Sequence, residues 1–104
     1  MKIISAGRRQ GKTTELIKKS NKEWKYIICA NKRRVNNIVK TADEMGLNIP
    51  YPITISELPL SKGQKMDGVL IDDIEDILQY LIGKRVDYVT TLCEIIHLER
   101  VEVE

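Results

Sequence analysis

One stretch near the N-terminus has residue types and spacing suited to binding phosphate groups. It consists of consecutive residues: Ala6, Gly7, Arg8, Arg9, Gln10, Gly11, Lys12 and Thr13. Gly11 lets the backbone approach a phosphate closely, and the N–H groups at the start of a helix attract anions. Lys12 is placed to reach the β- and γ-phosphates of a nucleotide, and the Thr13 hydroxyl to ligate Mg²⁺. The stretch therefore predicts a site for a nucleoside triphosphate with Mg²⁺.

The stretch fits the relaxed Walker A pattern, in which Ala or Gly precedes four free positions and then Gly-Lys-Ser/Thr. The strict pattern begins with Gly, whereas this chain has Ala6 there and Gly7 one position later. An apolar run leads in and a helical pattern leads out, which is the context the pattern requires. We include the following Thr14 in the predicted nucleotide site. The alternative is a glycine-containing turn that caps an ordinary helix.

Two consecutive aspartates follow a second apolar run. Asp72 ends the predicted strand 68–72, where a carboxylate could hold Mg²⁺ through water, opposite Thr13. Asp73 comes next and places a second carboxylate at the same strand end. The alternative for both is helix capping, because Glu75 and Asp76 follow and carboxylates stabilise a helix N-terminus.

The positive charge is concentrated in the first part of the chain. Residues 1–40 hold 12 Lys and Arg against 2 Asp and Glu, whereas residues 41–104 hold 5 against 13. Lys32, Arg33 and Arg34 are consecutive and have no aromatic neighbours in sequence, so they would contact a nucleic-acid backbone without base specificity. The alternative is a solvated first turn of a helix.

Strand and helix patterns alternate along the chain. Strands are expected at 2–6, 26–30, 53–55, 68–72 and 86–92, and an edge strand in the tail around Leu98, Val101 and Val103. Helices are expected at 12–20 with a stop at Asn21, from the cap Asn31 to Gly46, and from Ile74 to Gly83. This alternation predicts an α/β fold with three α/β/α layers and a mostly parallel sheet of about five strands.

Composition limits the protein class. The 104 residues suit one domain spanning 1–104, with 42% hydrophobic residues and no Phe. The two cysteines form no metal-binding or disulfide pattern, and no apolar run is long enough to cross a bilayer. We therefore expect a cytoplasmic protein without a membrane partner, and the host cytoplasm if the protein is viral.

The residues from Ala6 to Thr14, together with Asp72 and Asp73, resemble the P-loop ATPases with an additional catalytic acid, a group that includes RecA-like and helicase-like proteins. Within that group they are most similar to the ATPase domain of phage terminase large subunits. The resemblance implies ATP as the nucleotide, catalytic roles for Lys12 and Asp73, and a γ-phosphate contact by Arg8. The stretch from Gly11 to Ile17 is also similar, more weakly, to the thymidine kinase P-loop.

The resemblance implies ATP hydrolysis with Mg²⁺, in phage-related DNA packaging or DNA metabolism. Two alternatives stay open: a nucleoside or nucleotide kinase, and a non-catalytic nucleotide-dependent partner of a larger assembly. A domain of this size would close its nucleotide site with a neighbour, so a homo-oligomer or a larger protein partner is expected.

Overall fold

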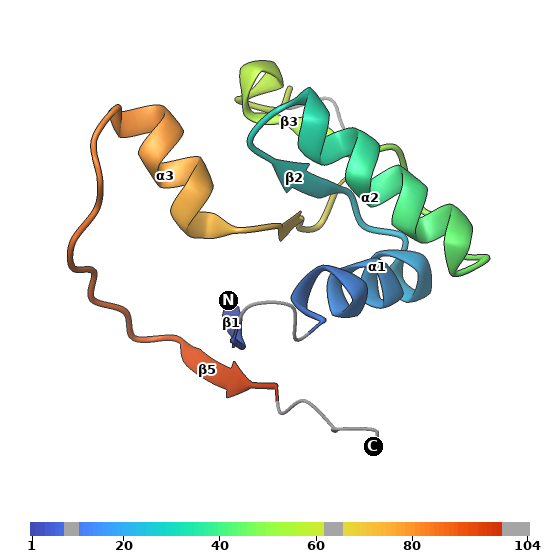
Figure 1. The fold of residues 1–104 in the computed structure, drawn as a ribbon, viewed down its shortest axis with the longest axis horizontal. Coiled ribbons are helices and arrows are strands. Elements are labelled where there is room, and N and C mark those ends of the chain that lie inside the picture. Colours follow the sequence, from blue (N-terminus) through green and yellow to red (C-terminus); the bar gives the residue numbers. More distant parts are fainter. Residues whose placement is uncertain (8–10, 62–65, 99–104) are drawn as a thin grey trace.

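The computed structural model describes residues 1–7, 11–61 and 66–98. The chain is an α/β domain with helices and short strands that alternate in sequence (Figure 1). The elements are β1 (Lys2–Ser5), α1 (Lys12–Glu23), β2 (Ile27–Cys29), α2 (Lys32–Glu44), β3 (Ile53–Thr54), the 3₁₀ turn η1 (Ile55–Glu57), β4 (Leu70–Ile71), α3 (Ile74–Ile82) and β5 (Glu94–His97).

The strands pair in parallel, as the alternation of strands and helices predicts. They form a three-stranded sheet in the order β3-β2-β4 and a separate two-stranded sheet of β1 and β5. The expected single sheet of about five strands is therefore wrong, because no strand joins β4 to β1 in the described part of the chain. The α/β class is confirmed.

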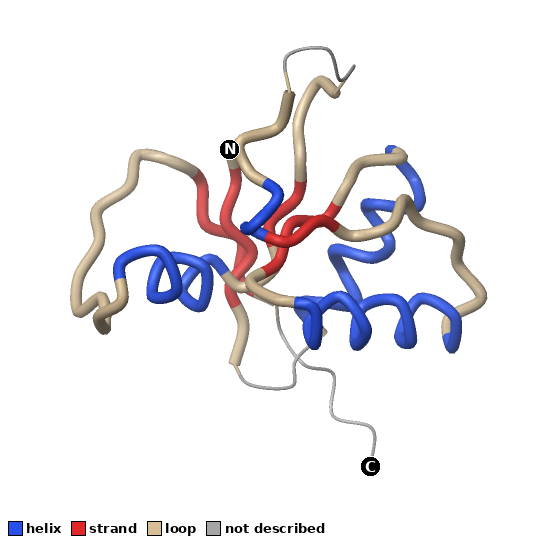
Figure 2. The backbone as a smooth tube through the Cα atoms, turned by 90° about the horizontal axis from the view of Figure 1, so that it is seen from above, coloured by secondary structure: helices blue, strands red, loops and turns tan. Residues whose placement is uncertain are grey.

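The central strand β2 is buried on both faces of the three-stranded sheet, and its alternate residues point to opposite sides. Ile27 and Cys29 pack with α1 and α2, in a cluster that includes the fully buried Ile17 and Val35. Ile28 packs on the other side with residues of β3 and α3, in a second cluster. Figure 2 shows helices on both sides of the strands. This packing fixes where the first turns of α1, α2 and α3 lie.

The helix ends follow the capping residues of the sequence in two of three cases. The Asn31 side chain accepts a hydrogen bond from the Arg34 backbone N–H (3.0 Å) and begins α2, and Gly83, with φ 78°, ends α3. Helix α1 does not stop at Asn21 but continues to Glu23. There Trp24 adopts a left-handed conformation with φ 54° and closes the helix in the place where glycine is usual.

The predicted strand 86–92 is not formed. These residues make no strand pairing, and Tyr88 and Leu92 are almost completely exposed. The partner of β1 is instead β5, which pairs residue by residue from Lys2 with Glu94 to Ser5 with His97. β-branched residues favour a strand only where a neighbouring edge and a surface to pack on are present. Leu98 follows β5 directly, whereas Val101 and Val103 lie outside the described residues.

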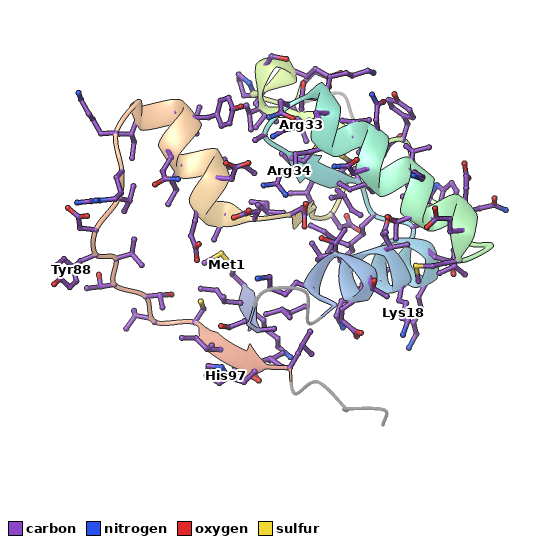
Figure 3. All side chains as sticks on the ribbon, in the orientation of Figure 1. Met1, Lys18, Arg33, Arg34, Tyr88 and His97 are labelled. Carbon is purple, nitrogen blue, oxygen red and sulfur yellow. The ribbon has the colours of Figure 1, made fainter. Side chains whose placement is uncertain are left out.

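Residues 83–93 arc away from the rest of the domain (Figure 1), with Tyr88 on the outer side (Figure 3). The radius of gyration is 14.3 Å, against about 13 Å expected for a compact chain of this length. In the residues that the structure describes, no helix is long and apolar enough to cross a membrane.

Candidate functional site

The predicted phosphate-binding stretch connects β1 to α1. Ala6 and Gly7 follow β1, and Gly11 is the N-cap of α1 with φ 87°. A left-handed backbone at this position favours glycine over other residues. A side chain added at Gly11 would meet no atom within 4 Å, so space is open on that side of the loop. Arg8, Arg9 and Gln10 lie outside the described residues.

Lys12 begins α1, and its side chain reaches back to the residue that follows β1. Its Nζ donates a hydrogen bond to the Ala6 carbonyl oxygen (3.3 Å), across the stretch that would surround a phosphate. The side chain is exposed, so this contact is easily exchanged for a stronger one. Thr13 and Thr14 follow in the first turn, both half-buried.

The Thr13 hydroxyl lies next to Asp72, as predicted. Thr13 Oγ1 donates a hydrogen bond to Asp72 Oδ1 (3.1 Å), between residues that are 59 positions apart. Backbone pairing places Asp72 at this point, because its N–H bonds to the Ile28 carbonyl oxygen (2.9 Å) as β4 ends. The first turn of α1 and the carboxyl end of β4 therefore meet at a pair of oxygen ligands.

Asp72 is only 5% exposed. Burial raises the pKa of its carboxyl group, and the nearby Asp73 raises it further, while the Thr13 hydrogen bond and the charges of Arg34 and Lys12 lower it. The net effect is a pKa above the usual range. A buried carboxylate with one hydrogen bond is costly to keep charged, and a bound cation would offset that cost.

Asp73 serves as the N-cap of α3, with a left-handed backbone at φ 58°. Its Oδ1 accepts the backbone N–H of Asp76 (3.2 Å), and its Oδ2 accepts a hydrogen bond from Arg34 (3.3 Å). The same Arg34 nitrogen forms an ion pair with Asp76 (3.2 Å). Both oxygens of Asp73 are thus engaged, which agrees with the capping interpretation.

The three basic residues at the start of α2 have different surroundings. Lys32 donates to the Tyr51 hydroxyl (2.8 Å) and lies over the Tyr51 ring, and that hydrogen bond raises the pKa of Lys32. Arg34 faces α3 through its ion pairs (Figure 3). Arg33 is exposed. They do not present a uniform cationic surface.

Sequence reasoning missed the connection between α2 and α3. Besides the Arg34 pairs, the Asn31 amide donates to the Tyr80 hydroxyl (2.9 Å), so the cap of one helix also contacts the other. This connection could have been inferred from the predicted sheet. Parallel β2 and β4 bring the residues that follow them, Asn31 and Asp73, to the same edge.

Within the described ranges, no group of three or more His, Cys, Asp or Glu side chains could hold a metal ion. Mg²⁺ does not need such a group, because it keeps several waters and is bound by one or two protein oxygens and substrate phosphates. Thr13 and Asp72 supply hard oxygen ligands of that type. A separate cavity of about 440 Å³, lined by Tyr26, Tyr51 and Glu57 among others, includes no residue of the predicted site.

The chain was compared with known proteins in three ways. No family model matches it, and no curated protein or solved structure is significantly similar to it. The resemblance to P-loop ATPases therefore rests on the sequence motif.

Proposed function

We propose that the protein binds ATP with Mg²⁺ through residues 6–14 and Asp72. The observation that carries the proposal is the 3.1 Å hydrogen bond from Thr13 to Asp72. Thr13 was assigned to Mg²⁺ from the Gly-Lys-Thr pattern, and Asp72 from its place at the end of another strand taken together with that pattern.

The described residues of the site suit the binding of ATP together with Mg²⁺. Gly11 leaves open space at the helix N-terminus, where phosphate oxygens are favoured by the N–H groups and the helix dipole. Lys12 would exchange the Ala6 carbonyl oxygen for phosphate oxygens, which form stronger, charge-assisted hydrogen bonds. When bound, Mg²⁺ would neutralise charge on the β- and γ-phosphates. We also propose that the domain has the three-layer α/β/α arrangement of a P-loop fold.

Hydrolysis is the second part of the proposal. The water oxygen would bond to the γ-phosphorus as the bond to the ADP oxygen breaks, with Lys12 stabilising the charge and Asp73 orienting the water. Arg8 is proposed to assist and lies outside the described residues. Asp73 would first have to release Arg34, because both of its oxygens are engaged.

The engagement of Asp73 also favours a second candidate function. A protein that binds ATP with Mg²⁺ but keeps Asp73 as a helix cap would turn ATP over slowly or not at all. Such a chain would act as a nucleotide-dependent partner in a larger assembly. Contact with DNA rests on the basic first part of the chain and, in its described part, on the exposed Arg33.

Calorimetric titration with ATP and Mg²⁺ tests the binding proposal. Lys12→Ala should weaken ATP binding by at least about tenfold, because a charge-assisted contact to phosphate is lost. Lys18→Ala is the matched control, since Lys18 is exposed on the same helix and should leave the affinity unchanged. A wild-type chain without affinity for ATP would contradict the proposal.

Phosphate release, measured with and without single- or double-stranded DNA, separates the functions. Release stimulated by DNA and lost in Lys12→Ala supports an ATPase of DNA metabolism. Tight binding without release supports the non-catalytic partner, and transfer of the phosphate to an added nucleoside would identify a kinase.

A further inference from the structure

Arg34 is held between two carboxylates at the edge of the proposed nucleotide site. One of its terminal nitrogens lies 3.3 Å from Asp73 Oδ2 and 3.2 Å from Asp76 Oδ2. The arginine comes from the first turn of α2, and both aspartates come from the start of α3. A single guanidinium nitrogen thus joins two helices that follow neighbouring strands.

The same guanidinium is within electrostatic range of the proposed Mg²⁺ ligand. The charge of Arg34 lowers the pKa of Asp72, and so does the charge of Lys12. Two cations therefore act on Asp72: Lys12, which the sequence assigns to the phosphates, and Arg34, which the sequence assigns to nucleic-acid contact. Arg34 belongs to the same cluster of charges although the sequence places it in the basic turn 32–34.

The contacts of Arg34 are of a kind that can be exchanged. Its side chain is 35% exposed and the side chains of Asp73 and Asp76 are 37% and 26% exposed, so water and salt weaken both pairs. Arginine stays charged at all relevant pH values, and its planar fork matches a phosphate as well as a carboxylate. A triphosphate in the site would compete for it as a second oxyanion.

We propose that Arg34 contacts the terminal phosphate of the bound nucleotide and releases Asp73 as it does so. The inference rests on the proposed function and assigns a further residue to that site. Without nucleotide, the Arg34 guanidinium stays paired with the Asp73 carboxylate. With a triphosphate, Arg34 turns to the γ-phosphate, and Asp73 becomes available to orient water. A diphosphate lacks the group that draws Arg34 away, so Asp73 stays paired.

Affinities for ATP and ADP, each measured by calorimetry with Mg²⁺, test this role. The wild-type chain should prefer ATP. In Arg34→Ala the affinity for ATP should fall by about tenfold or more while the affinity for ADP changes less than about twofold, because one charge-assisted contact to the γ-phosphate is lost. Arg34→Lys should restore part of the preference, since it keeps the charge without the fork.

Asp76→Asn is the matched control for a merely structural role. It weakens the Arg34 contact between the helices but keeps the guanidinium, so the preference for ATP should remain at least as large as in the wild type. Equal loss of the preference in Asp76→Asn and Arg34→Ala would overturn the proposal. So would an Arg34→Ala chain that keeps its ATP preference, or one that loses only its affinity for a 20-nucleotide DNA strand.

The outcomes separate this inference from the function on which it depends. ATP binding that is lost in Lys12→Ala but unaffected in Arg34→Ala leaves the proposed function standing and removes Arg34. A wild-type chain that binds neither nucleotide overturns both.

Discussion

Asp72→Asn should make the protein more stable and less able to bind Mg²⁺ at the same time. Asp72 is 5% exposed, and among the described residues its carboxylate accepts one side-chain hydrogen bond, from Thr13. An asparagine keeps an oxygen in the same place to accept that bond and carries no charge to desolvate. The substitution therefore removes the free-energy cost of burying a charge while it keeps the Thr13 hydrogen bond that connects α1 to the end of β4.

The gain should be about 1 kcal/mol near neutral pH, within the range of single stabilising substitutions. For a domain of this size that corresponds to a rise in Tm of roughly 4–8 °C. Loss of a carboxylate that holds Mg²⁺ through water should weaken Mg²⁺-dependent ATP binding by about 10- to 100-fold. A stabilising change that impairs binding is the expected pattern for a functional side chain.

The effect should depend on pH with a defined sign. Burial raises the pKa of Asp72 above its ordinary value of 3.8, so the folded chain holds this proton more tightly than the unfolded chain. The stability from this group is fully present below about pH 3.8 and is lost as the pH rises through the folded-state pKa. The advantage of Asp72→Asn over the wild type should therefore grow with pH across that window and then level off.

Urea unfolding from pH 3.5 to 7.5, without nucleotide, measures the stability difference, and calorimetry measures Mg²⁺-dependent ATP binding. Asp67→Asn is the control, since Asp67 is exposed and its stability change should stay within about 0.5 kcal/mol. A destabilised Asp72→Asn chain, or one with unchanged Mg²⁺-dependent binding, would refute the reasoning.

Two predictions concern the packing that positions the site. Ile17→Ala removes a fully buried side chain of α1 and should cost about 2–5 kcal/mol in urea unfolding; a smaller loss would mean that α1 is not anchored through this residue. Asn31→Ala removes both the cap of α2 and the bond to Tyr80, and should cost about 1–2 kcal/mol. Tyr80→Phe removes only the bond and should cost about 0.5–1 kcal/mol, and equal losses in the two variants would assign no stability to the cap.

The sequence predicted the helices well because their ends carry local chemical signals. Asn31 and Gly83 mark α2 and α3 in the sequence and in the structure. The end of α1 was predicted too early because Trp24 closes it with a positive φ, which a non-glycine residue adopts only rarely. Strand pairing was predicted less well, since it depends on which edge is within reach. Residues 86–92 have strand-forming side chains but β5 pairs with β1.

The contact between Thr13 and Asp72 was only partly predictable from topology. The sequence predicted β1 and β4 in one parallel sheet, which would bring their carboxyl ends to one edge, but the two strands lie in separate sheets. Thr13 reaches Asp72 because α1 packs against β2, the neighbour of β4. The engagement of Asp73 by Arg34 was not predictable, because it depends on the side-chain directions of a residue in the first turn of α2 and of the N-cap of α3. From the sequence, Asp73 had two possible roles, catalysis and helix capping. In the structure its Oδ1 accepts the Asp76 backbone N–H, which is the hydrogen bond of a helix cap.

The pairing of β1 with β5 has a consequence for the order of folding. β1 begins at Lys2 and its partner at Glu94, so most of the chain lies between the two strands. Closing so long a loop is slow, whereas β2, β3 and β4 pair over shorter separations. We therefore expect the three-stranded sheet with α2 to form first and the β1–β5 pair last. The loop that would hold phosphate is attached to β1, so it would be the last part of the protein to reach its final shape, and a triphosphate added during refolding should speed that step.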